Sequence, residues 1–218
     1  MSAAASHPSA TPDLPFERIL CVIDLSDGGT EAVRQATMLA RSRGSIDLVS
    51  VAPGAAAVLE RTAEHDLVVM AAGDAGLEVL RGAPGSVLLT RRPPEGSPFP
   101  ESILVAVDGS AEAHAAARLA AQLAARHRAV VTLVATPEHD ASHQHALQHD
   151  IRTVERITGT RPLVLDEYRG AARSIVIAAR AVQASMIVVG RRAGNPSPSV
   201  SAEVAAAAPC SVLAVRAG

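Results

Sequence analysis

Three residues follow short apolar runs that are typical of buried strands, and a small ligand could bind where they lie. They are Asp108 after residues 103–107, Thr136 after residues 130–135, and Gly190 at the end of 185–190. In open parallel sheets, ligands bind outside the carboxyl ends of the strands, where the strand order reverses. The three residues are therefore candidates for contact with a nucleotide. For Asp108 the alternative is a structural role, in which its carboxylate holds the strand-to-helix turn.

Four histidines between residues 138 and 150 could bind a metal ion. They form two i, i+4 pairs, His139 with His143 and His145 with His149, and metal sites on helices use this spacing. The pairs are displaced by six residues, so they lie on different faces of a helix and do not form one four-ligand site. We favour a polar, solvated helix and predict no metal site; a weak zinc or nickel site is the alternative.

The usual catalytic motifs are missing from the sequence. It contains no G-x-S-x-G nucleophile turn, no H-E-x-x-H zinc motif and no Walker loop, and it has no lysine at all. We therefore expect that the protein is not an enzyme.

The composition narrows the possible partners. The chain has 218 residues, 48% of them hydrophobic, with 20 basic against 22 acidic residues and a formal net charge of -2. This balance argues against a disordered chain and against a basic nucleic-acid binder. The only aromatic rings besides histidine are Phe16, Phe99 and Tyr168, so few side chains could stack on bases. We expect no nucleic-acid partner.

Targeting signals and membrane spans are also missing. No apolar stretch is long enough to cross a bilayer, and residues 1–15 lack the basic start and apolar centre of a secretory signal. These features predict a cytoplasmic protein with no membrane partner. Cys21 and Cys210 stand in apolar runs far apart in the chain, which favours buried thiols in a reducing compartment over a disulfide.

The sequence contains an internal repeat. Residues 18–53 align without a gap on 102–137 at an offset of 84, which pairs Asp24 with Asp108 and Arg34 with Arg118. Two later blocks also match: 65–72 with 184–191, and 83–92 with 208–216. Between the early and late blocks the first copy is about 35 residues shorter, which is enough for a helix and a strand.

Strands and helices alternate in the second copy. The predicted strands are 103–107, 130–135, 162–167, 185–190 and 211–215, and the predicted helices are 111–128, 140–158, 171–183 and 199–207. This order predicts an α/β fold with a parallel sheet between two layers of helices. The proline-rich stretch 92–102 predicts a linker. The predicted organisation is a flexible leader (1–16), an abbreviated domain (17–94), a linker (95–100) and a full domain (101–218).

Four sequence blocks together resemble the universal stress proteins of the UspA type. They are ILVAVDGS (103–110), VVTLVATP (130–137), SMIVVGRR (185–192) and APCSVLAVR (208–216). The resemblance covers 101–218 and, in abbreviated form, 17–94. It implies a tandem protein with two Rossmann-like domains, of which the first is abbreviated and the second has a five-stranded parallel sheet.

The resemblance also implies a candidate nucleotide site. One branch of the family binds ATP with a G-x2-G-x9-G-[S/T] loop after the fourth strand and an aspartate after the first. The family pattern, with Thr136 added from its strand end and Arg191 from its charge, gives these cofactor-binding candidates: Asp108, Thr136, Gly190, Arg191, Gly194 and Ser199. Arg191 and the adjacent Arg192 could hold phosphate by charge; the alternative is that both are solvated surface residues.

This sequence departs from the ATP-binding pattern. The second glycine position holds Ala193, the third holds Pro198, and the spacer between them has four residues. Proline has no N–H to donate to a phosphate. In the first copy the corresponding stretch carries Asp74 and Glu78, which would repel phosphate. We therefore expect ATP binding to be degenerate or lost, and an adenine-nucleotide sensor using the second domain is the alternative.

The family implies how the two copies associate. Its domains pair through the last strand, so residues 86–90 are expected to lie against 211–215 in a pseudo-dimer. Pairing two edge strands hides a surface that would otherwise promote aggregation. We expect a non-catalytic stress-response protein that acts through self-association, as a homo-oligomer, or through an unknown protein partner.

Overall fold

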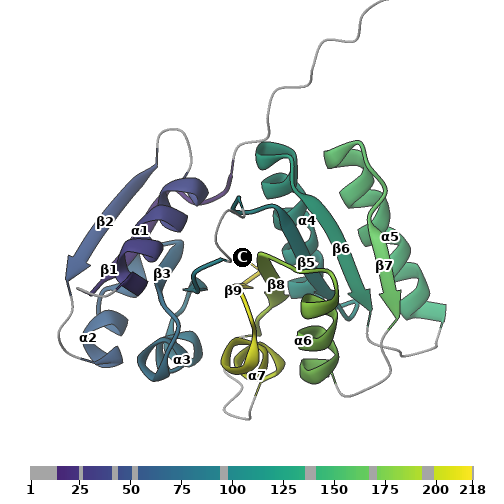
Figure 1. The fold of residues 1–218 in the computed structure, drawn as a ribbon. Helices are drawn as coiled ribbons and strands as arrows, with labels where there is room; N and C mark the ends of the chain where they lie inside the picture. The colour runs from purple at the N-terminus through teal and green to yellow at the C-terminus, as the bar shows by residue number, and fades with distance from the viewer. Residues whose placement is uncertain are drawn as a thin grey trace, which may run out of the picture.

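One sheet runs through the whole molecule (Figure 1). The computed structural model describes residues 14–24, 27–40, 44–50, 54–93, 98–135, 141–166, 171–192 and 199–217. Within these residues the sheet has nine strands in the order β2-β1-β3-β4-β9-β8-β5-β6-β7. No helix in this part of the chain is both long and apolar enough to cross a membrane.

The chain builds this sheet from two halves. The strands of the first half are β1 (Arg18–Ile23), β2 (Ser45–Ser50), β3 (Leu67–Ala71) and β4 (Ser86–Thr90). Those of the second half are β5 (Ser102–Val107), β6 (Val130–Ala135), β7 (Leu163–Asp166), β8 (Met186–Gly190) and β9 (Ser211–Val215). Neighbouring strands are parallel within each half. This confirms the predicted α/β class with Rossmann-like parallel sheets.

The helices differ between the halves, as predicted from the missing stretch of about 35 residues in the first copy of the repeat. The first half has α1 (Asp27–Leu39), the short α2 (Ala55–Leu59), the 3-10 turn η1 (Thr62–Glu64) and α3 (Asp74–Gly82). The second half has α4 (Ala111–His127), α5 (Ala141–Thr158), α6 (Ala171–Ala181) and α7 (Val200–Ala207). Among the described residues, the first half has no counterpart of α5 or β7. β2 is therefore an outer strand of the sheet, with β7 at the opposite edge (Figure 1).

The sequence explains why α4 forms and where it packs. The Ser110 hydroxyl accepts a hydrogen bond from the Ala113 backbone N–H at 3.2 Å, which caps the helix. Ala116, Ala120 and Leu123 are buried at helical spacing. Small side chains on this face let the helix lie close to the sheet. The helix ends at Arg128, whose backbone is left-handed with φ of 60°.

The core consists of two layers, one on each face of the sheet. One layer packs against α1, α4 and α5 and contains Cys21, and the other packs against α2, α3, α6 and α7 and contains Cys210. Both cysteines are free and buried. Burial raises the pKa of Cys21 to about 11 and that of Cys210 to about 12. The structure thus has two separate buried thiols rather than the alternative disulfide.

The two halves meet at an antiparallel pair of strands, β4 and β9, in the middle of the sheet. Leu88 faces Leu213, and both side chains are fully buried. This is the strand pairing that the sequence predicts for 86–90 and 211–215. We call this pair, with the side chains that bridge it, the seam.

Hydrogen bonds across the seam repeat with near two-fold symmetry. The Arg91 backbone N–H donates to the Ser211 hydroxyl at 2.9 Å, and the Arg216 backbone N–H donates to the Ser86 hydroxyl at 3.2 Å. Ser86 and Ser211 occupy equivalent places in the sequence repeat, as do Arg91 and Arg216. The seam therefore resembles a symmetric dimer interface, in which the same surface is used twice.

A second contact between the halves should make stability depend on pH. His127 on α4 donates from Nε2 to the Met38 carbonyl at the end of α1, at 3.2 Å. Burial lowers the pKa of His127, and this outweighs the opposing effect of the Met38 hydrogen bond. The folded protein therefore favours neutral His127, and the stability this gives is lost as pH falls from about 6.5 toward the lower folded pKa.

We expect a His127→Gln variant, which keeps a neutral donor, to lose less stability than the wild type on acidification below pH about 6.5. The difference should be small, below about 1 kcal/mol, because the histidine is partly exposed. Urea unfolding at a series of pH values measures it. Identical pH profiles would show that His127 does not favour its neutral form in the folded protein.

Candidate functional site

The strand order of the second half reverses between β5 and β8. Residues 103–105 of β5 pair in parallel with residues 186–188 of β8, although the two strands are far apart in the sequence. Asp108 follows β5 and Gly190 ends β8, so both lie where open α/β sheets bind ligands. Thr136 and Gly194 lie outside the described residues.

Asp108 holds the turn between β5 and α4. Its Oδ1 accepts hydrogen bonds from the Ser110 backbone N–H at 3.0 Å and from the Ser110 hydroxyl at 2.6 Å. The same hydroxyl caps α4, so the carboxylate, the hydroxyl and the helix N-terminus form one chain of hydrogen bonds. This is the structural role that the sequence left as the alternative. The other oxygen, Oδ2, lies 3.8 Å from Arg192 Nη2.

Gly190 and Ser199 also have structural roles. A Cβ on Gly190 would lie 2.7 Å from the Glu112 carbonyl carbon and 2.8 Å from the Ala113 nitrogen, so only glycine lets α4 approach the end of β8 this closely. Ser199 caps α7 by accepting a hydrogen bond from the Ala202 backbone N–H at 3.3 Å. Both positions are thus explained without a phosphate.

The side chain of Arg191 does not lie where the sequence predicts it. Its guanidinium donates to the carbonyls of Leu80 at 3.1 Å and Ala83 at 2.7 Å, and also to that of Gly85. These carbonyls lie at the end of α3 and just after it, in the first half, and Arg191 is buried. Neither sequence interpretation fits, because the side chain points into the seam rather than toward a phosphate or into solvent. Burial lowers its pKa, and the charge of Arg216 adds to this effect.

The equivalent position in the first half holds Ala72. The backbone is the same at both places, because Ala72 N–H donates to the Thr90 carbonyl and Arg191 N–H donates to the Val215 carbonyl. The side chains differ, so the end of α3 accepts hydrogen bonds from Arg191, whereas the equivalent end of α7 accepts one from Arg91, whose guanidinium donates to the Ala205 carbonyl at 3.1 Å. Two non-equivalent arginines thus make the contacts to the two helix ends.

Of the arginine pair, only Arg192 remains near the predicted site. Its side chain is 67% exposed and lies 3.8 Å from Asp108 and 3.9 Å from Glu112. At these distances and this exposure, the ion pairs contribute little to stability. In the described part of the site, an anionic ligand would therefore meet one cationic side chain, Arg192, and two carboxylates, Asp108 and Glu112.

A small cavity lies at the corresponding edge of the first half. Its volume is about 210 Å³ and its lining includes Asp24, Gly73 and Asp74. Sites for ligands of drug-like size measure about 300–1,000 Å³. Asp74 stands in the first turn of α3, so a carboxylate already occupies the helix end where a phosphate would be stabilised. A phosphate at this helix end would meet the Asp74 carboxylate.

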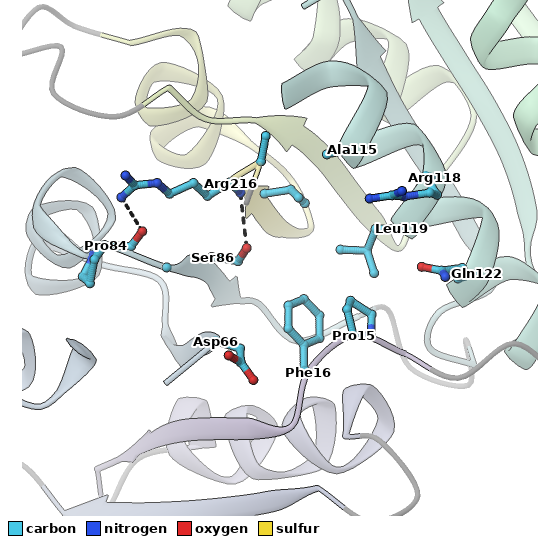
Figure 2. A pocket seen from close by; sticks show the side chains of 13 residues that line it. Pro15, Phe16, Asp66, Pro84, Ser86, Ala115, Arg118, Leu119, Gln122 and Arg216 are labelled. Carbon is cyan, nitrogen blue, oxygen red and sulfur yellow. Dashed lines mark hydrogen bonds between the residues drawn. The ribbon is translucent and has the colours of Figure 1, made fainter. Parts of the chain in front are cut away.

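A larger cavity lies between the two halves (Figure 2). Its volume is about 490 Å³; Phe16 and Leu119 form apolar parts of its wall, and Arg118, Gln122 and Arg216 add polar groups. The Arg216 guanidinium already donates to the Pro84 carbonyl. Asp66 already accepts hydrogen bonds from the backbone N–H groups of Glu17 and Arg18. Sequence reasoning missed this cavity because both halves must meet before it exists.

Comparison with known proteins supports the family resemblance. Residues 135–216 match the model of the universal stress protein family. A universal stress protein from Archaeoglobus fulgidus DSM 4304 is similar in structure, with a TM-score of 0.72 and 15% identity over 92% of this chain and 96% of that one. No curated protein matches the sequence significantly.

Two further solved structures are similar. A protein from Pseudomonas aeruginosa UCBPP-PA14, described as a putative universal stress protein, has a TM-score of 0.67 and 18% identity over 93% of this chain and 94% of that one. A universal stress protein in complex with cAMP has a TM-score of 0.50 and 23% identity over 54% of this chain and 98% of that one. Residues 135–216 thus match the universal stress protein family, and the whole chain shares its fold with solved universal stress proteins.

Proposed function

We propose that this chain is a non-catalytic, cytoplasmic stress-response protein that acts through protein partners, with its two halves held as a permanent internal pair. The burial of Arg191 in the seam is the observation that supports this most strongly. A residue whose charge and position after Gly190 made it a candidate for phosphate binding is used here to fix one half to the other.

The other described candidates support the same proposal. Asp108 holds a turn, Gly190 makes room for α4, and Ser199 caps α7. In the first half, Asp24 and Asp74 line a cavity that is small for a nucleotide. The described residues of the family pattern thus have roles in folding, and Arg192 is the cationic side chain that the described residues leave beside Asp108.

Self-association through the last strands takes place within one chain in this proposal, because β4 and β9 pair with each other. A homo-oligomer of this chain would need other surfaces. The outer strands β2 and β7 end the sheet on either side.

Adenine-nucleotide binding by the second half is the second candidate function. A related structure contains cAMP, and Asp108 and Arg192 lie together at the point where the strand order reverses. In this alternative, Asp108 Oδ2 contacts the nucleoside and Arg192 moves from the carboxylates to a phosphate. ATP, AMP or cAMP would then act as a signal rather than as a substrate.

Calorimetric titration separates the two candidates. Nucleotide-stripped protein is titrated with Mg-ATP, AMP and cAMP, beside Asp108→Ala and the repeat-equivalent Asp24→Ala. We expect no saturable heat for any nucleotide up to millimolar concentration. Binding at one site per chain that Asp108→Ala weakens at least tenfold, and Asp24→Ala leaves unchanged, would contradict our first proposal and establish the nucleotide sensor.

A further inference from the structure

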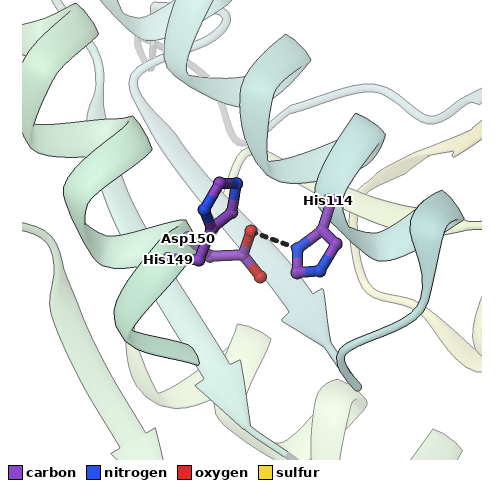
Figure 3. Close-up of side chains that lie close together, drawn as sticks. All are labelled: His114, His149 and Asp150. Carbon is purple, nitrogen blue, oxygen red and sulfur yellow. Dashed lines mark hydrogen bonds and ion pairs between the residues drawn. The ribbon is translucent and has the colours of Figure 1, made fainter. Parts of the chain in front are cut away.

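Two histidines and an aspartate meet between α4 and α5 (Figure 3). His114 comes from the second turn of α4, and His149 and Asp150 come from the middle of α5. His114 Nδ1 lies 2.6 Å from Asp150 Oδ1. The His114 and His149 rings meet edge to face, with centroids 5.1 Å apart. The sequence pairs His149 with His145, whereas the structure places it beside a histidine of another helix.

The carboxylate of Asp150 is incompletely satisfied. The residue is only 1% exposed, and Oδ2 is buried without a hydrogen-bond partner among the described residues. Burial raises the pKa of Asp150, although the hydrogen bond from His114 opposes this rise. A buried carboxylate oxygen with no donor is costly. A bound cation would remove that cost.

The donor atoms are of the kinds that zinc and similar ions prefer. Imidazole nitrogen and carboxylate oxygen bind Zn²⁺ at about 2.0–2.2 Å, and three protein ligands leave a fourth position open. One donor atom from each residue lies within 4.8 Å of the other two, whereas donors around a tetrahedral zinc ion are about 3.4 Å apart. His149 is exposed, so its ring is able to move closer, while Asp150 stays fixed in the interior.

We propose that His114, His149 and Asp150 form a binding site for a divalent transition-metal ion, with zinc as the preferred ion. The ion joins the N-terminal part of α4 to the middle of α5. The proposed ligands come from two helices, unlike the i, i+4 histidine pairs within one helix that the sequence offered as the alternative. The proposal also departs from the prediction that the chain has no metal site. The site is independent of nucleotide binding, because none of its ligands belongs to the family pattern.

The test uses the full-length chain, treated with EDTA and dialysed, and titrated with Zn²⁺ against a chromophoric chelator. His149→Gln removes an exposed ligand without disturbing the core, and Asp150→Asn keeps the shape of the buried one. His145→Gln, one turn earlier on the same helix, is the matched control. We expect one Zn²⁺ per chain in the wild type and in the control, and at least tenfold weaker binding in the other two variants.

Binding of Co²⁺ gives a second measurement, because a four-coordinate site with histidine and carboxylate ligands gives an intense visible spectrum. We expect that spectrum in the wild type and its loss in His149→Gln. Absence of Zn²⁺ binding by folded wild-type protein would overturn the proposal. Equal losses in His145→Gln and His149→Gln would also overturn it, because the ion would then be held by one helix alone.

Discussion

A Val212→Asp variant is expected to be largely insoluble or unfolded. Val212 is 1% exposed on β9, where it pairs with Leu89 across the seam and with Ile187 on β8. A carboxylate there would have no cationic partner, and an unpaired buried charge costs several kcal/mol. That is a large share of the about 5–15 kcal/mol that stabilises a typical domain. Soluble yield and thermal unfolding by circular dichroism measure the effect.

Two further variants make this prediction specific to the seam. Val87→Asp changes the facing strand β4 at another fully buried position, and we expect the same result. Leu163→Asp places the same charge on β7, where the side chain is 54% exposed, and we expect solubility and melting close to the wild type. Normal solubility of Val212→Asp would show that β4 and β9 do not pair in solution.

Arg191→Ala should destabilise the protein by about 2–4 kcal/mol. The substitution removes a buried guanidinium and leaves the carbonyls of Leu80 and Ala83 without the donor they now have. Hydrogen bonds from a charged donor contribute about 1.5–3 kcal/mol, and a buried acceptor without a partner costs about 1–3 kcal/mol. Urea unfolding of the two proteins gives the difference in free energy of unfolding.

The adjacent arginine is the matched control for Arg191. Arg192 is 67% exposed and forms only long ion pairs, so Arg192→Ala should change stability by less than about 0.5 kcal/mol. Arg191→Lys should recover part of the loss, because an ammonium group can reach a carbonyl but cannot donate in two directions from a planar fork. Equal stabilities of Arg191→Ala and Arg192→Ala would mean that the guanidinium does not join the halves.

The fold could be predicted well because the sequence repeat gives the same pattern of strands and helices in each half. Pairs of equivalent residues have equivalent roles in the structure: Asp66 Oδ2 accepts from the backbone of Glu17 and Arg18, and Ser185 Oγ accepts from that of Glu101 and Ser102. Apolar runs and turn residues fix such local features. The shorter spacing in the first copy also predicted the loss of a helix and a strand.

The site could not be predicted in the same way. An arginine after a strand is equally consistent with a phosphate contact, a surface position or a buried hydrogen bond, and only the packing of α3 against the second half selects the last for Arg191. His114 is one of two histidines in the alanine-rich α4, and its partner Asp150 is 36 residues away. The sequence pattern within one helix carries no information about such a contact.

The seam has a consequence for how this protein responds to dilution. Two separate chains that paired through their last strands would dissociate as their concentration fell, by mass action. Here β4 and β9 belong to one polypeptide, whose two halves are joined by residues 91–101, so each strand meets the other at an effective concentration on the order of millimolar. The paired state is therefore the same in a cell that makes few copies as in one that makes many. Dissociation of the two halves is therefore not expected to regulate this protein, because their assembly is complete as soon as the chain folds.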